Sequence, residues 1–132
     1  MTVQYSTTLR NNQLDQVEST ISTSPKLQIR TGAQPANCAA ADAGSLLAEL
    51  TLPSDWMNAA GSGTKTLNGT WTGTASGSGT AAHFRIKDST GTTTHMQGSV
   101  GEGSGDLSLD NTDIASGQTV NVTAFTITAG NA

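Results

Sequence analysis

The chain has 132 residues, which suits a single domain, and only 34% of them are hydrophobic and 4% aromatic. These fractions predict a thin core and argue against a deep catalytic cleft. The net charge is −4, and the six Lys and Arg are scattered between Arg10 and Lys87, so the sequence lacks the basic patch of a nucleic-acid-binding protein. Only 12% of the residues are charged, against about 25% in an ordinary soluble domain, which favours a surface buried against neighbouring molecules.

No segment of the sequence predicts insertion into a membrane or export. The longest apolar stretches fall far short of the roughly 20 residues that cross a bilayer. The first residues, Met1–Tyr5, lack the apolar core of a secretory signal. We therefore expect a protein that is made in the cytoplasm and has no membrane partner.

Residues 1–24 are predicted to form a helical arm. Leu14, Val17 and Ile21 recur at helical spacing and form a narrow apolar stripe. Pro25 ends the helix, because the residue before a proline disfavours the helical conformation. The stripe is compatible with packing on the chain's own sheet or on a neighbouring molecule.

Residues 25–132 are predicted to form a single β-sandwich domain, because apolar and polar residues alternate there. The 22 Thr favour strands, and the 14 Ser and 15 Gly favour turns. Strands are predicted at residues 26–30, 45–52, 64–74, 82–87, 94–96, 107–109 and 118–128. In the last strand Val120 and Phe125 have opposite parity, which predicts a β-bulge near Thr123-Ala124. The predicted fold class is all-β, an antiparallel β-sandwich of jelly-roll type with a short N-terminal helix.

A hairpin is the clearest local structure. Residues 82–87 alternate apolar and polar side chains, and Asp88-Ser89-Thr90-Gly91 follows them as a turn. A three-residue loop with Gly91 in the left-handed conformation predicts a register that places Phe84 opposite Met96.

His83 and His95 form the strongest constellation of polar side chains. The predicted register puts them diagonally across adjacent strands, at a separation that could seat a transition metal with one further ligand. Asp88 lies at the hairpin tip, too far away to be an obvious third ligand. We therefore expect both histidines to face solvent or an interface.

Acidic residues and the cysteine do not predict a site either. The spacing of Asp106, Asp110 and Asp113 differs from that of the ligands in an EF-hand loop, so turn formation is favoured over calcium binding. Cys38 is the only cysteine, so no internal disulfide can form, and it has no partner at zinc-ligand spacing. It is expected to be a small, half-buried residue.

Trp56 and Trp71 allow two interpretations. Pro53–Met57 is predicted to form a helical turn that lays Trp56 over the core, and Trp71 lies in the strand predicted at 64–74. Exposed tryptophans would suggest a sugar-stacking site. A core with so few aromatics needs both for burial, so packing is favoured.

The sequence contains no motif of an enzyme. It has no Gly-x-Ser-x-Gly elbow, no Walker loop and no His-Glu-x-x-His. We therefore expect no catalytic residue, no cofactor and no metal.

Four stretches carry a resemblance to a known class of proteins. They are TSPKLQIRTGAQPANCAAAD (23–42), LTLPSDWM (50–57), HFRIKDSTGTT (83–93) and LDNTDIASGQTVNVTAFTITAGNA (109–132). On these stretches the chain resembles small structural proteins encoded by tailed bacteriophages and prophages. The resemblance implies a virion component of β-sandwich type, a head decoration or cement protein. It transfers no functional residue, because such proteins act through whole surfaces.

The expected function is therefore structural. A decoration protein would bind the major capsid protein and copies of itself as a homo-oligomer, and weak contacts would be multiplied by the lattice. One alternative is a protein of the tail, baseplate or fibre, and another is a carbohydrate-binding β-sandwich module that uses an exposed tryptophan.

Overall fold

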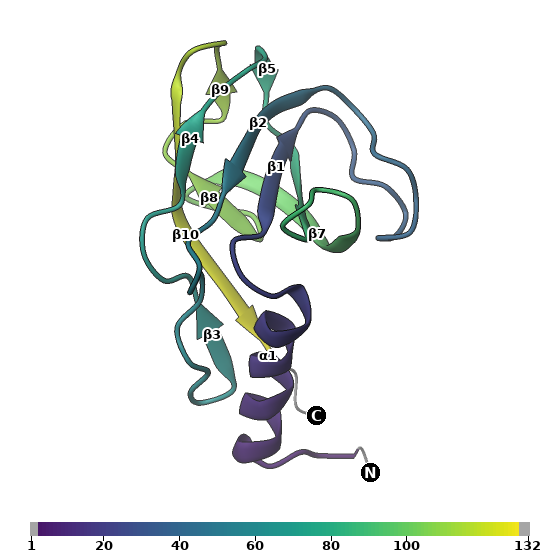
Figure 1. The fold of residues 1–132 in the computed structure, drawn as a ribbon, viewed down its shortest axis with the longest axis vertical. Coiled ribbons are helices and arrows are strands. Elements are labelled where there is room, and N and C mark those ends of the chain that lie inside the picture. The colour runs from purple at the N-terminus through teal and green to yellow at the C-terminus, as the bar shows by residue number, and fades with distance from the viewer. Residues whose placement is uncertain (1–2, 130–132) are drawn as a thin grey trace.

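A computed structural model describes residues 3–129, which form one N-terminal helix followed by ten strands (Figure 1). The helix α1 spans Thr7–Ile21. The strands are β1 (Lys26–Arg30), β2 (Leu46–Thr51), β3 (Thr64–Thr66), β4 (Thr72–Thr74), β5 (Gly79–Thr80), β6 (His83–Lys87), β7 (Thr94–Glu102), β8 (Leu107–Leu109), β9 (Asp113–Ile114) and β10 (Thr119–Thr128). The prediction of a mostly β protein with a short N-terminal helix is confirmed.

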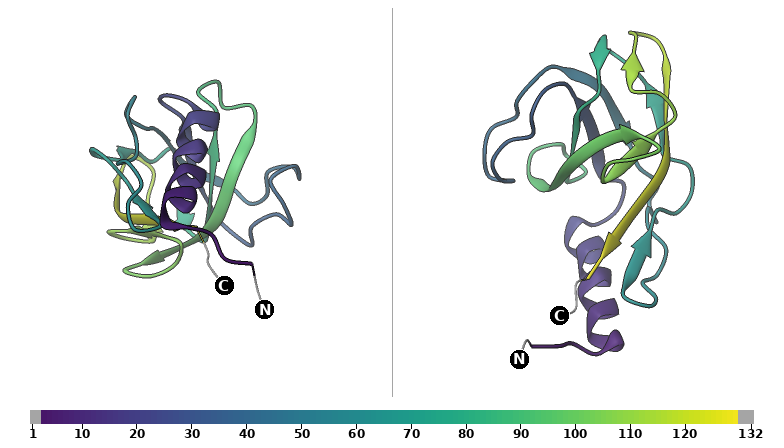
Figure 2. Two further views of the ribbon diagram at one scale, coloured as in Figure 1. Left: turned by 90° about the horizontal axis from the view of Figure 1, so that it is seen from below. Right: turned by 180° about the vertical axis from the view of Figure 1, so that it is seen from behind.

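Eight strands form one mixed sheet that curls back on itself. The strand order is β2-β1-β6-β7-β8-β10-β3, with β4 also paired to β10, and β5 and β9 pair separately. The backbone N–H groups of Ser76 and Gly77 donate to the carbonyl of Leu47 at 2.8 and 3.1 Å. The segment after β4 therefore meets β2, and the curled sheet encloses the core (Figure 2).

A parallel pair within the sheet differs from the antiparallel arrangement that the sequence predicts. β7 and β8 run parallel, with Val100 opposite Leu107, although only four residues link the two strands. Parallel neighbours normally need a long crossover. The short return requires glycine at two positions. A Cβ on Gly101 would collide with the Ser104 hydroxyl, and Gly105 adopts a φ of 80° that favours glycine.

An aromatic chain fills the centre of the core. Trp56, Trp71, Phe125 and Phe84 follow one another with ring centroids 5.9, 5.4 and 5.6 Å apart. All four are 3% exposed or less. The prediction that both tryptophans pack in the core is confirmed.

The bulge predicted in the last strand is confirmed. The pairing of β10 with β8 shifts between Val122 and Ala124, which leaves Thr123 as the extra residue. Val120 and Phe125 are consequently both buried despite their opposite parity.

The hairpin register differs by two residues from the predicted one. Met96 lies opposite Ile86, and Phe84 lies opposite Gly98. One extra residue enters the loop, where the Asp88 carboxylate accepts the backbone N–H groups of Thr92 and Thr93 at 2.9 and 3.4 Å. The second extra residue forms a β-bulge at the start of β7. The left-handed conformation of Gly91 is confirmed, with a φ of 73°.

Two further local predictions are corrected. Pro53–Met57 forms a bend and not a helical turn, and Met57 then bridges to Leu67. The strand predicted at 64–74 is interrupted between β3 and β4, where Gly69 adopts a φ of 73°.

The helix packs on its own chain. Leu14 and Ile21 are buried, and Ser6 caps the N-terminus by accepting the backbone N–H of Leu9 at 3.1 Å. At the same end, the Arg10 side chain donates to the carbonyl of Ala129 at 3.2 Å, so the two ends of the described chain lie close together.

A buried lysine fastens the helix to β3. Lys65 is 2% exposed, and its Nζ lies 2.7 Å from Asp15 and 3.0 Å from Glu18 on α1. Burial by itself lowers the pKa of Lys65, but hydrogen bonds to Asp15 and Glu18 outweigh it, so the pKa lies above its ordinary value. The ion pairs therefore persist as the pH rises until it passes that raised pKa.

We expect Lys65→Met to lower the free energy of unfolding by about 1–2 kcal/mol, because it leaves two neighbouring carboxylates without their cation. Urea unfolding followed by circular dichroism measures the change. Lys26→Met is the matched control, since Lys26 contacts only the Thr51 hydroxyl through its Nζ among residues 3–129. Equal stability of the two variants would contradict a role for Lys65 in holding the helix.

Candidate functional site

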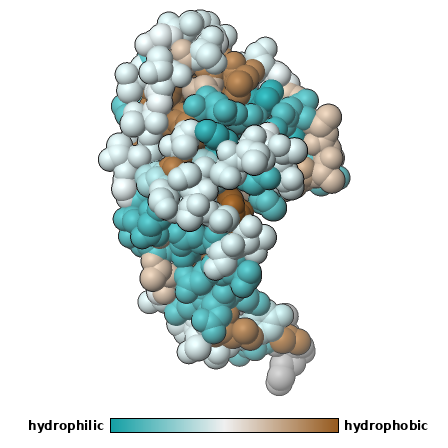
Figure 3. Space-filling view, in the orientation of Figure 1, coloured by the Kyte–Doolittle hydropathy of each residue, from teal (hydrophilic) through white to brown (hydrophobic). Residues whose placement is uncertain are grey.

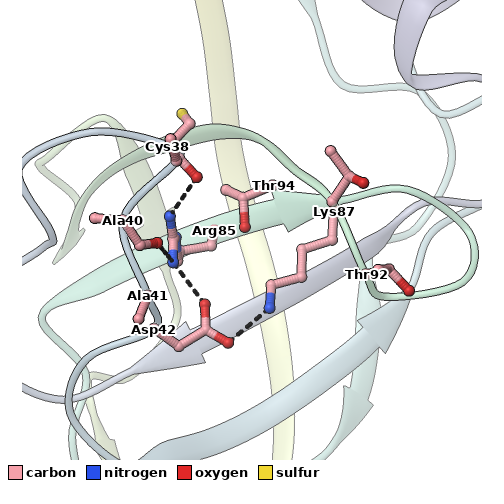
Figure 4. A pocket seen from close by; sticks show the side chains of 10 residues that line it. Cys38, Ala40, Ala41, Asp42, Arg85, Lys87, Thr92 and Thr94 are labelled. Carbon is pink, nitrogen blue, oxygen red and sulfur yellow. Dashed lines mark hydrogen bonds and ion pairs between the residues drawn. The ribbon is translucent and has the colours of Figure 1, made fainter.

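A shallow pocket of about 620 Å³ lies where the segment between β1 and β2 folds over the outer face of β6. Asp42 lies between Arg85 and Lys87 (Figure 4), and Arg30 is a third cation beside it. Its carboxylate lies 2.6 Å from Arg85, 2.6 Å from Lys87 and 3.2 Å from Arg30. This cluster, which we call the Asp42 cluster, is the densest group of charges in the described chain.

The guanidinium of Arg85 binds the chain of the overlying segment directly. Arg85 is 1% exposed and donates to the carbonyls of Asn37, Cys38 and Ala40 at 3.3, 2.9 and 3.0 Å. Together with the bond to Asp42, these contacts use both of its terminal nitrogens. Arg85 therefore acts as a clamp that holds the segment on the sheet.

Two neighbours of Arg85 extend this clamp. The Gln97 side chain donates to the carbonyl of Pro35 at 2.8 Å, and His83 Nδ1 lies 2.8 Å from the carbonyl of Gly32. A carbonyl oxygen can only accept, so His83 Nδ1 donates in this contact. The polar side chains of β6 are thus covered by the backbone of the segment between β1 and β2 and are shielded from solvent.

The electrostatics of the cluster favour an ionised Asp42. Burial by itself raises the pKa of Asp42, but hydrogen bonds from Lys87 and Arg85 and the charge of Arg30 outweigh it, so the pKa lies below its ordinary value. An ionised carboxylate among three cations is a stable structural ion cluster.

The two histidines lie apart and in different environments. His83 pairs with Ser99 across the hairpin, which is four residues from His95 along β7, or about 13 Å. His83 is 1% exposed, whereas His95 is exposed. The prediction of a diagonal pair is therefore wrong, because it rested on the incorrect register. The expectation that both face solvent or an interface is also wrong for His83, which lies beneath the segment between β1 and β2.

The three aspartates serve separate local contacts. Asp106 accepts the backbone N–H and hydroxyl of Ser99 at 2.9 and 3.0 Å, and Asp110 accepts the Asn121 side chain at 3.1 Å. Asp113 lies 3.4 Å from the Thr80 hydroxyl. Among residues 3–129, no group of three His, Cys, Asp or Glu is placed to bind a metal ion.

Cys38 is half-buried, as expected, and its thiol points away from Arg85 (Figure 4). Its backbone carbonyl, and not its sulfur, takes part in the clamp. Trp56 and Trp71 are 0% and 1% exposed, so neither can stack on a sugar.

Exposed apolar side chains gather at the opposite end of the molecule. Within residues 3–129, the large hydrophobic residues that are exposed are Val3, Tyr5 and Leu9, at 74%, 43% and 44%. Figure 3 shows hydrophobic surface at this end of the molecule, around the first turn of α1. We call residues Val3–Ser6 the N-terminal arm.

Sequence reasoning missed both the Asp42 cluster and the exposed arm residues. Arg85 and Lys87 alternate with apolar residues, which is also the pattern of a solvated strand face. Val3, Tyr5 and Leu9 are separated by polar residues, so no apolar run in the sequence indicated the exposed apolar surface.

The described chain contains no helix that is long and apolar enough to cross a membrane. No protein-family model, curated protein or solved structure matches the chain.

Proposed function

We propose that this protein is a structural component of a tailed-phage virion that decorates the head and cements its lattice through contacts with the major capsid protein and with copies of itself. The observation that carries the proposal is that, within residues 3–129, the exposed large apolar residues lie together near the start of the chain, at Val3, Tyr5 and Leu9. Such a concentration of exposed apolar side chains marks an interaction site.

The rest of the molecule supports a role in assembly. The helix that carries the arm is fastened to the sheet by Lys65, which presents the arm on a rigid support. The proposal includes a jelly-roll-like sandwich as the frame, formed by the facing parts of the curled sheet. Repeated placement on a lattice makes each weak contact effective, so a small apolar patch suffices.

The copy number in purified particles tests the proposal. Mass spectrometry with isotope-labelled peptides would compare this protein with the major capsid protein. We expect a ratio near one to one or a simple lattice fraction of it. A control on disrupted and repurified heads separates bound protein from contamination.

A ratio of a few per cent would contradict a decoration role and would favour the tail or baseplate. Complete absence from particles would contradict any virion role. The carbohydrate-binding alternative has no support from Trp56 or Trp71, because both are buried.

A further inference from the structure

A groove runs beside the first half of β7 and has two lobes that share Met96. One lobe, of about 260 Å³, lies between β7 and α1, and the other, of about 330 Å³, lies between β7 and the end of β10. The first is lined by Gln13, Gln16, Val17, Thr20, Ile21, His95 and Met96. The second is lined by Phe84, Met96, Gln97, Asp106 and residues 125–128. We call the two lobes together the β7 groove.

The core is incompletely covered along this groove. Six apolar residues pack against the core while remaining partly exposed, and three of them, Val17, Met96 and Ile127, line the groove. The rings of Phe84 and Phe125 form its floor. His95 and Asp106 are the ionisable residues among its lining, so the groove suits an uncharged, partly apolar occupant.

The groove also exposes strand edges. β8 pairs with β7 only at Val100–Glu102, so the earlier part of β7 has a strand neighbour on one side only. Backbone groups alternate in direction along a strand. The N–H of Val100 donates to Ala82, the residue before β6, so the backbone groups of Gln97 point away from β6. The backbone N–H of Ser99 also points away from β6, and the Asp106 carboxylate accepts it. An extended chain can therefore add to this edge.

The N-terminal arm has the properties of such a chain. Its apolar residues Val3 and Tyr5 alternate with Gln4 and Ser6, which is the period of a strand. Ser6 has extended backbone angles, and Val3–Ser6 contains no charged side chain. Four extended residues span about 13 Å, which fits along residues 94–97 of β7, before the Ser99 N–H that Asp106 accepts.

We propose that the N-terminal arm of one molecule adds as a strand to β7 in the groove of a second molecule of the same chain, with Val3 and Tyr5 directed at Met96 and the aromatic floor. In the described chain the arm lies outside its own groove, since Val3 and Tyr5 are 74% and 43% exposed and neither lines a lobe, so the groove is open to the arm of another molecule. If two molecules each insert an arm into the groove of the other, a dimer forms. If each molecule inserts its arm into the groove of the next, a chain or ring forms.

This inference extends the proposed function by naming how copies join, and it is tested on the purified chain alone. Sedimentation velocity over a concentration series should show reversible self-association. Val3→Asp and Tyr5→Asp should each weaken it about tenfold or more, because each buries a charge in an apolar groove. Gln4→Asp, with the same charge on the opposite face of the arm, is the matched control and should associate more strongly than either.

A purified chain that stays monomeric throughout would overturn the inference while leaving a virion role open, because particle copy number is measured independently. Equal effects of all three Asp variants would also overturn it, since strand addition requires alternation. Circular dichroism of each variant confirms folding.

Cross-linking locates the contact. In a Cys38→Ser background, Val3→Cys combined with His95→Cys should give disulfide-linked oligomers, because Val3 is directed into the groove that His95 lines. Val3→Cys with Ser116→Cys is the control, since Ser116 is exposed but belongs to the turn between β9 and β10. Equal cross-linking of both pairs, or none with His95→Cys, would overturn the assignment of the β7 groove.

Discussion

Replacement of Trp71 by Ala is expected to lower the free energy of unfolding by about 3–5 kcal/mol. Trp71 contacts both Trp56 and Phe125, and its indole N–H donates to the carbonyls of Trp56 and Asn68 at 3.2 Å each. The substitution therefore removes the middle ring of the aromatic chain and leaves a cavity in the core. Because small domains are stable by only about 5–15 kcal/mol, a large share of the stability is lost.

Urea unfolding monitored by far-ultraviolet circular dichroism measures this loss. Trp71→Phe is the graded control, because it keeps an aromatic ring and gives up the indole hydrogen bonds, so its loss should be smaller. A Trp71→Ala variant within about 1 kcal/mol of the parent would show that the ring is not central to the core. It would also reopen the possibility that Trp71 serves a ligand.

Replacement of Asp42 by Asn is expected to lower the free energy of unfolding by about 2–4 kcal/mol, because three cations lose their counter-ion. Two of them, Arg85 and Lys87, have side chains only 1% and 8% exposed and cannot be fully hydrated. Urea unfolding at neutral pH measures the loss. The segment between β1 and β2 should also become more accessible to proteases, because its clamp is weakened.

The effect of Asp42→Asn should depend on pH. The folded-state pKa of Asp42 lies below its ordinary value of 3.8, so its stabilisation is complete above that value and is lost as the pH falls through the folded pKa. The difference in stability between parent and variant should therefore shrink in acid. Glu102→Gln is the control, since Glu102 is exposed and forms no salt bridge within residues 3–129. A pH-independent difference would contradict a charge effect.

Local periodicity was sufficient to predict several elements of the fold. The apolar spacing of Leu14 and Ile21 predicted the helix, and the change of parity between Val120 and Phe125 predicted the bulge in β10. Both signals come from residues close together in sequence, and burial then enforces them.

Features set by particular backbone conformations could not be predicted in the same way. The parallel return from β7 to β8 depends on Gly101 and Gly105, which look like any flexible Gly-rich connection in the sequence. The predicted hairpin register was wrong because Asp88 binds two backbone N–H groups and lengthens the loop. The alternation of apolar and polar residues could not reveal the error, because a shift of two residues leaves every side chain on the same face of the sheet.

The Asp42 cluster was missed for a related reason. Polar residues on alternate positions of β6 suggested a solvated face, and nothing in the small-residue segment 32–44 indicated that its carbonyls would cover Arg85. Arg85 and Lys87 lie 43 and 45 residues from Asp42 in sequence, so only the folded chain brings them together.

The closure of the sheet between β2 and the segment after β4 has a consequence for colloidal behaviour. An open sheet edge can template unspecific growth of β-aggregates, and a charge-poor, Thr-rich protein packed at high local concentration is especially prone to this. Here the β2 edge is engaged by Ser76 and Gly77, and the other end strand, β3, has only three residues. Unspecific growth is thereby hindered at both ends of the sheet.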